Sequence, residues 1–196
     1  MDRVSYEILE LIYALQRQKR IIVSIGMLFL VSFLVSYLLI LNIPWIRNFG
    51  EEILLALFTS LNLKNIGSMG AGEVFLLIVE HNLFVNLLNY ILNIFSTFVV
   101  MLNAFILAYV LSVIGPLKFI LLIGPHGIVE IPALILGSSA GVVLFTSLVY
   151  RLKGDRLKAS LQFFDSLRLF FLSMVLFTVA AFIESFITFG IKSLLL

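Results

Sequence analysis

Long runs of apolar residues dominate the chain and predict membrane-spanning helices. A helix of about 20 apolar residues crosses the hydrocarbon core of a bilayer. Apolar and polar positions do not alternate as they would in a transmembrane barrel, and backbone groups in lipid need the internal hydrogen bonds of a helix. The pattern therefore predicts an all-α polytopic bundle with about five spans in a single transmembrane domain covering 1-196. The predicted spans cover residues 21-42, 73-93, 95-115, 127-150 and 167-190.

The segments outside these runs have patterns of their own. Residues Val4, Ile8, Leu11, Ile12 and Leu15 recur at helical spacing, which predicts an amphipathic helix within 1-20 on the membrane surface. The polar stretch 42-72 is the one sizeable predicted loop, with an apolar insert resting at the membrane interface.

The apolar stretch 73-115 has about twice the length of one span, and we divide it at a tight hairpin near 93-96. The junction contains no glycine or proline, the residues that usually mark such a turn. A short apolar piece after Gly115-Pro116 predicts a re-entrant or interfacial segment before the fourth span.

Composition and charge agree with a membrane protein and suggest its orientation. Hydrophobic residues make up 62% of the chain, charged residues 12%, and the mean hydropathy is +1.17, which excludes a soluble fold. Nine of the 13 Lys and Arg residues fall on the side of the N-terminus, so the N-terminus is predicted to be cytoplasmic in the cell membrane. Cysteine is absent, which excludes disulfides and thiolate metal sites.

Five acids and histidines in or directly beside the predicted spans are candidates for a site, because each is costly in a membrane unless it is paired, neutralised or bound. Glu80 and His81 belong to the second span, His126 and Glu130 open the fourth, and Glu184 is in the fifth. Counted from the outer ends of their spans, the three glutamates lie at similar depths, roughly 7 to 10 Å below the outer surface. This agreement predicts a shared site in the outer leaflet.

The chemistry of these side chains suits a divalent metal such as zinc. His126 and Glu130 are four residues apart and share a helix face. Neutral imidazole and carboxylate oxygen are common zinc ligands, so the predicted metal ligands are His126, Glu130, Glu184, Glu80 and His81. The alternative is a structural site in which the His/Glu pair only hydrogen-bonds to neighbouring asparagines.

Asparagines form a second polar feature. Asn82, Asn86, Asn89 and Asn93 advance by four, three and four residues, which places them on one stripe of the second span. Asn103 lies near mid-membrane in the third span. The stripe predicts hydrogen bonds between helices or a polar track towards the cytoplasm. Small residues between Gly137 and Gly141 predict close helix packing in the fourth span.

The motif GPHGIVEIPA, residues 124-133, resembles the signature of the stage II sporulation protein M family. Asn82, Asn103 and the segment AAFIESFIT with Glu184 are similar to further positions of that family, over roughly 75 to 190. His81 and Ala104 depart from it, where the family has asparagine and glycine. The resemblance implies an integral membrane protein, which in spore-forming bacteria works with cell-wall hydrolases. Homologues in organisms that never sporulate carry no settled activity, so no sporulation role is transferred.

Three functions fit these features. The first is a non-catalytic membrane scaffold or subunit of an envelope-associated complex with a structural His/Glu site, with or without a metal. The second is an intramembrane metal-dependent hydrolase, with Glu130 or Glu184 as general base and His126 as a ligand. The third is transport of a proton, an ion or a small solute along the asparagine stripe. The expected partners are the lipid bilayer and other membrane or cell-envelope proteins, with a homo-oligomer as a further option; no motif for nucleic acid is present.

Overall fold

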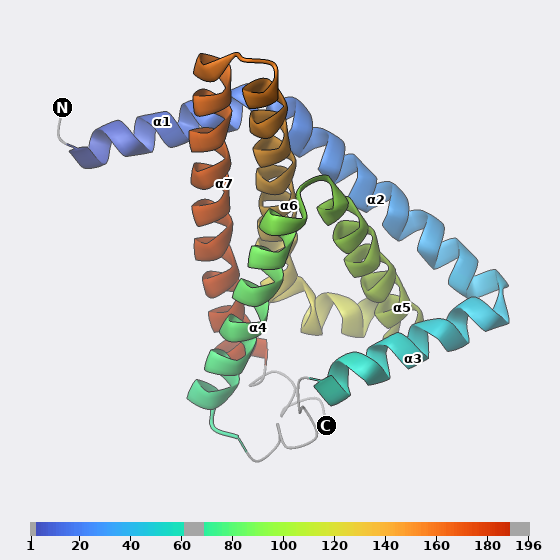
Figure 1. The fold of residues 1–196 in the computed structure, drawn as a ribbon. Coiled ribbons are helices and arrows are strands. Elements are labelled where there is room, and N and C mark those ends of the chain that lie inside the picture. Colours follow the sequence, from blue (N-terminus) through green and yellow to red (C-terminus); the bar gives the residue numbers. More distant parts are fainter. Residues whose placement is uncertain (1–2, 61–68, 189–196) are drawn as a thin grey trace.

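The computed structural model describes residues 3–60 and 69–188 and contains only helices and short connections in these ranges (Figure 1). The all-α fold class is therefore confirmed. Residues 1–2 of the predicted surface helix and residues 189–190 of the predicted fifth span lie outside the described ranges.

The N-terminal part consists of three helices in succession, α1 (Arg3–Arg17), α2 (Lys19–Asn42) and α3 (Pro44–Ser60). Gln18 interrupts the first two with a ψ of 6°, and Ile43 separates the next two in an extended conformation. Extended geometry is expected before proline, and Pro44 then opens α3 at its first position. The predicted helix within 1-20 thus corresponds to α1.

Helix α3 corrects the predicted loop over 42-72 for residues 44–60, and residues 61–68 of that loop lie outside the described ranges. Its residues Ile46 and Leu54 pack against the buried side chains of Ile40, Ala108 and Tyr109, which belong to α2 and α5. Tertiary packing therefore holds a continuous helix where the sequence predicts a polar loop with a short apolar insert. In Figure 1, α2 and α3 form a V beside α5 (Ser96–Leu122).

The predicted hairpin near 93-96 lies between α4 (Ala71–Leu92) and α5, where a short 3₁₀ turn, η2 (Asn93–Phe95), joins them. The chain reverses direction there (Figure 1). Asn93 makes this turn with a φ of 56°, a value that asparagine tolerates better than most residues. Ser96 Oγ donates to the Asn93 carbonyl at 2.6 Å and closes the turn.

Helix α5 bends sharply at Gly115, where φ is 77° and ψ is 164°. Such a φ is strained for any residue with a side chain, and Pro116 then sets the direction of the following turn. The stretch from Pro116 to Leu122 runs across the lower end of the molecule before α6 begins, as the yellow segment of Figure 1 shows. It occupies the place of the predicted interfacial segment.

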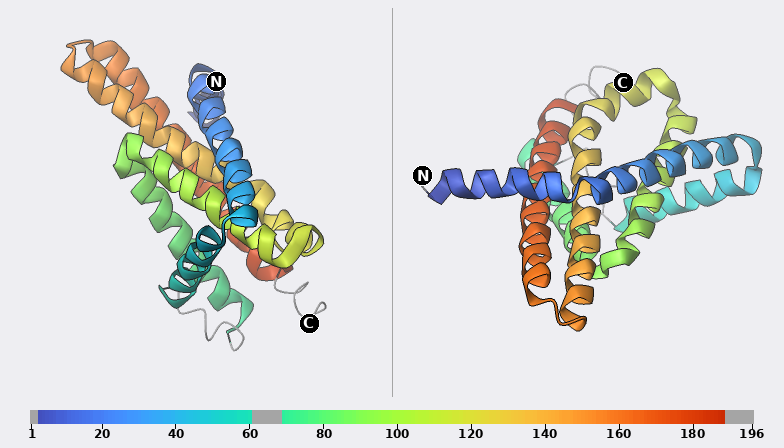
Figure 2. Two further views of the ribbon diagram at one scale, coloured as in Figure 1. Left: turned by 90° about the vertical axis from the view of Figure 1, so that its right-hand side faces the viewer. Right: turned by 90° about the horizontal axis from the view of Figure 1, so that it is seen from above.

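Helices α6 (Gly124–Leu152) and α7 (Arg156–Ile183) form an antiparallel pair, and α1, α2, α4 and α5 each contact one or both of them (Figures 1 and 2). Asp155 caps α7 by accepting from the Lys158 backbone N–H at 3.1 Å. Helix α7 thus begins 11 residues before the predicted fifth span, at Arg156. A π-helical turn, η3 (Glu184–Thr188), follows it.

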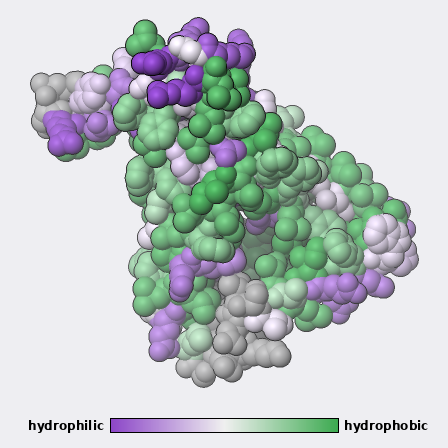
Figure 3. All heavy atoms as spheres, viewed as in Figure 1, coloured by the Kyte–Doolittle hydropathy of each residue, from purple (hydrophilic) through white to green (hydrophobic). Residues whose placement is uncertain are grey.

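Four segments of the described chain are long and apolar enough to cross a membrane: Lys19–Asn42, Ala71–Leu122, Gly124–Leu152 and Arg156–Phe186. The second is a run of 52 residues that contains both α4 and α5. Apolar side chains cover the middle of the molecule, and polar ones gather mainly over α1 and the joined ends of α6 and α7 (Figure 3). The chain is a multi-pass membrane protein; the division into five spans and the cytoplasmic N-terminus stay predictions.

Candidate functional site

The GPHGIVEIPA motif forms the beginning of α6. Pro125 occupies the first turn, where its missing N–H removes no helix hydrogen bond. His126 follows Pro125 directly, and its Nε2 lies 3.8 Å from Oε2 of Glu130, one turn further along α6. The His126 side chain is 7% exposed and that of Glu130 is 35% exposed. The predicted i, i+4 pair is therefore present, with the imidazole inside the bundle and the carboxylate at its edge.

Glu184 joins this pair from the other end of the chain. It opens the π-helical turn η3, and such turns often occur at functional sites because they re-aim side chains. Helix α6 contacts η3, and the Glu130 and Glu184 carboxylates are close enough to interact electrostatically. The structure thus brings His126, Glu130 and Glu184 to the same end of the α6–α7 pair.

Glu80 and His81 are placed differently. Glu80 is exposed on the surface of α4, and His81 is half-buried. Within the residues that the structure describes, no group of three or more His, Asp or Glu side chains lies close enough to hold a metal ion. The five predicted ligands therefore do not gather into one donor set that fits zinc, and metal binding stays a prediction.

The asparagine stripe lies inside the bundle. Asn82, Asn86 and Asn89 are all buried on the face of α4 that meets α6 and α7. Ser173 Oγ of α7 donates to Asn86 Oδ1 at 2.9 Å and also lies 2.8 Å from the Ala133 carbonyl of α6. One serine thus joins three helices through the stripe.

The small residues of α6 make this contact possible. A Cβ placed on Gly137 would lie 2.1 Å from Asn86 Oδ1 and 2.9 Å from Ser173 Oγ. At the next residue of α6, Ser138 Oγ lies 2.8 Å from Ser96 Oγ, and this contact binds the start of α5 to α6. The predicted small-residue surface is the place where α4 and its turn approach α6.

Not every polar atom of the stripe has a protein partner. Asn86 Nδ2 and both side-chain polar atoms of Asn89 are buried without one. Asn103 is separate from the stripe, because it lies on α5 and donates to the Val99 carbonyl of its own helix at 2.8 Å. Burial of unpaired amides is costly, so α4 must be held tightly by the contacts that are made.

A polar cluster at the opposite end of α7 was missed by sequence reasoning. Asp165 is fully buried and accepts hydrogen bonds from Arg17 Nε at 3.0 Å, Arg17 Nη2 at 2.5 Å and Gln18 Nε2 at 2.8 Å. Next to it, Ser166 Oγ lies 3.1 Å from the Tyr90 hydroxyl. The one feature of the sequence that could have indicated this cluster is the position of Asp165, an isolated acid between Phe164 and Ser166, two residues before the predicted fifth span.

Comparison with known proteins agrees with the motif. The family model described as Stage II sporulation protein M matches residues 22–189. An uncharacterized protein of Methanocaldococcus jannaschii is 37% identical over 195 residues, which cover 97% of this chain and 91% of that protein. No solved structure matches. The match includes the His126, Glu130 and Glu184 positions as well as the asparagine stripe, and the chain belongs to the stage II sporulation protein M family.

Proposed function

We propose that the protein is a non-catalytic membrane scaffold, or a subunit of an envelope-associated complex, whose buried polar residues hold its helices in one arrangement. The contact between Asn86 and Gly137 carries this proposal. With a built Cβ only 2.1 Å from Asn86 Oδ1, the two helices approach too closely for a solute to pass between them at this level. The stripe therefore serves packing in preference to transport.

The outer His/Glu site fits the same role. His126 and Glu130 begin α6, Glu184 follows α7, and the first turns of α4 pack beside them through Phe75, which lies 6.3 Å from Phe182 between ring centroids. At this end of the molecule, the aromatic contact between Phe75 and Phe182 thus joins α4 to α7 beside the three polar side chains. The hydrolase alternative needs a metal with at least three protein ligands, and the described residues do not bring three together.

The test compares Glu130→Gln with Glu80→Gln, which removes an exposed acid at similar predicted depth. Each tagged protein is extracted from native membranes in a mild detergent, and both thermal stability and the size of the purified assembly are measured. We expect Glu130→Gln to lower stability and the yield of the assembly, because the contact between the Glu130 carboxylate and the buried His126 imidazole is lost. Glu80→Gln should leave both unchanged.

Two results would contradict the scaffold proposal. One is an ion or proton flux in proteoliposomes that Asn86→Ala abolishes while the protein stays folded, which would indicate transport. The other is a stoichiometric metal in the purified protein that is lost in His126→Ala, together with hydrolysis of a membrane peptide or lipid, which would indicate the hydrolase.

A further inference from the structure

Helix α1 has two different faces. Glu7, Glu10, Ala14 and Arg17 face α7, where Arg168 lies 3.4 Å from both Glu7 and Glu10 and Ala14 is fully buried. About 140° around the helix, an apolar stripe is left open. Its residues Val4, Ile8 and Ile12 are 68%, 55% and 45% exposed.

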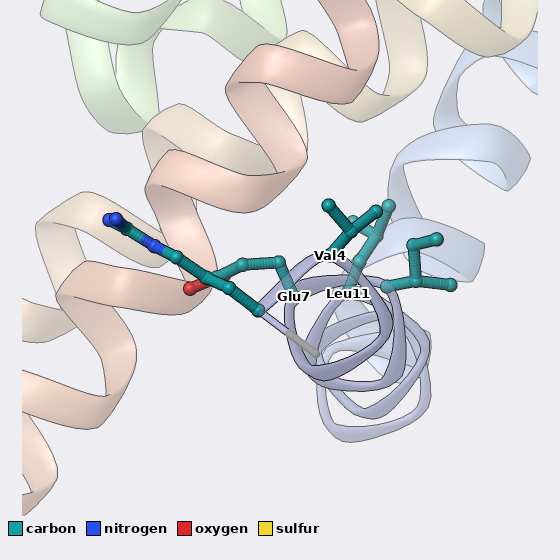
Figure 4. A pocket seen from close by; sticks show the side chains of 5 residues that line it. Val4, Glu7 and Leu11 are labelled. Atoms are coloured by element: carbon teal, nitrogen blue, oxygen red, sulfur yellow. The ribbon is translucent and has the colours of Figure 1, made fainter. Parts of the chain in front are cut away.

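The close view in Figure 4 shows how these faces are arranged. Val4 and Leu11 point to one side of α1, and Glu7 points away from them, towards α7. Together with Arg3 and Ile8, these side chains line a shallow, mainly apolar depression along the helix. The ion pairs with α7 therefore leave the apolar stripe free for another contact.

The direction of α1 is fixed by the buried acid of α7. Asp165 binds the last residue of α1, Arg17, and also Gln18, which separates α1 from α2. Helix α1 consequently runs crosswise to α7, and its N-terminal part projects beyond the bundle in Figure 1 and in the right-hand view of Figure 2. If α6 and α7 cross the bilayer, α1 lies along the membrane plane.

Exposed cations gather at the same end of the molecule. Arg3, Lys19 and Arg20 belong to α1 and the start of α2, and the connection from α6 to α7 adds Arg151, Lys153, Arg156 and Lys158. Among the described residues, the acids nearby are paired: Glu7 and Glu10 contact Arg168, Glu10 also contacts Arg17, and Asp155 contacts Lys158. The described cations at this end of the molecule therefore outnumber the described acids.

We propose that α1 is an anchor that binds an anionic lipid surface. The apolar stripe of Val4, Ile8 and Ile12 enters the boundary between headgroups and acyl chains, and the surrounding Lys and Arg residues contact lipid phosphates. An amphipathic helix with cations beside its apolar face binds membranes in this way, and anionic lipids strengthen the binding. This proposal is independent of the scaffold role and of the outer His/Glu site.

The cysteine-free chain allows a direct test. Ile8→Cys is labelled with an environment-sensitive fluorophore, and Tyr6→Cys, two residues away and about 160° around the helix, is the matched control. Both full-length proteins are reconstituted in vesicles of phosphatidylcholine alone or with phosphatidylglycerol. Quenching by lipids that carry a nitroxide near the headgroup is then measured.

We expect the label at position 8 to be quenched several-fold more than the label at position 6, and more strongly in anionic vesicles at low salt. Lys153→Glu combined with Arg156→Glu should remove the dependence on anionic lipid while leaving quenching in neutral vesicles unchanged. Equal quenching in both lipid mixtures would overturn the anionic preference. A position-8 label that iodide quenches freely, or that neither quencher reaches, would overturn the lipid anchor in favour of water or a protein partner.

Discussion

Asn86 and Gly137 form the tightest contact along the asparagine stripe, so a single added methyl group at Gly137 should destabilise the protein. We expect Gly137→Ala to lower the free energy of unfolding by roughly 1–3 kcal/mol, because Asn86 and Ser173 would have to move out of a packed interior. Thermal unfolding in detergent would measure it. Gly72→Ala is the control, since an added Cβ there meets nothing within 4 Å. An equal decrease in the free energy of unfolding in both variants would contradict the close approach of Gly137 to Asn86.

Asp165, the buried acid of α7, forms an ion pair with Arg17 of α1. Asp165→Asn and Arg17→Gln each remove one charge from the same ion pair. In a double-mutant cycle we expect a coupling energy of about 0.5–3 kcal/mol, because residues in one hydrogen-bond network are not additive. Unfolding in denaturant or detergent would supply the four values. Strict additivity would mean that Arg17 and Asp165 do not stabilise each other.

Residue spacing was enough to predict one part of the site. His126 and Glu130 are neighbours because i and i+4 share a helix face, and this follows from the sequence alone. Glu184 could be placed at the right depth, but its approach to Glu130 depends on how α7 packs on α6. Glu80 shows the limit of the depth argument, because a residue at the same level can face outwards. The role of Asp165 could not be predicted from local spacing, because its partners Gln18 and Arg17 lie 147 and 148 residues away in the sequence.

At the scale of whole elements, the start of α7 is sensitive to pH. The Lys158 backbone N–H and side chain hold the pKa of Asp155 below its usual range. A depressed pKa means that the cap stabilises the folded protein above the unfolded pKa of about 3.9 and that this contribution is lost as pH falls through the folded pKa. We expect the melting temperature of the wild type to fall in that range more steeply than that of Asp155→Asn. Parallel curves for the two proteins would contradict the cap.

Elements were predictable where the pattern was long and uniform. The apolar runs that became α2, α4, α5 and α6 could be recognised from hydropathy, and the turn at 93-96 followed from the length of one span. Helix α3 could not be recognised, because packing against Tyr109 and Ile40 decides its structure. Helix α7 begins 11 residues before the predicted fifth span, because its first turns are polar and carry no membrane signal.

At the scale of the whole molecule, the orientation can be tested with single cysteines. Lys153→Cys lies in the connection from α6 to α7, and Lys118→Cys lies in the segment after the bend at Gly115. With a cytoplasmic N-terminus, a membrane-impermeant maleimide should label position 118 in intact cells and position 153 only after permeabilisation. Labelling in the reverse order would place the N-terminus outside.

The turn at Asn93–Phe95 leaves no polar loop between α4 and α5, so the two helices have to enter the bilayer together during synthesis. When they enter, the Asn86 side chain has none of its packing or hydrogen-bond partners, because Gly137 is synthesised later and Ser173 follows Asn86 by 87 residues. Helix α4 therefore enters the membrane before α6 and α7, which cover its asparagine side chains in the folded protein. Until α7 has been synthesised, the insertion machinery or a neighbouring protein must protect the incomplete chain from degradation.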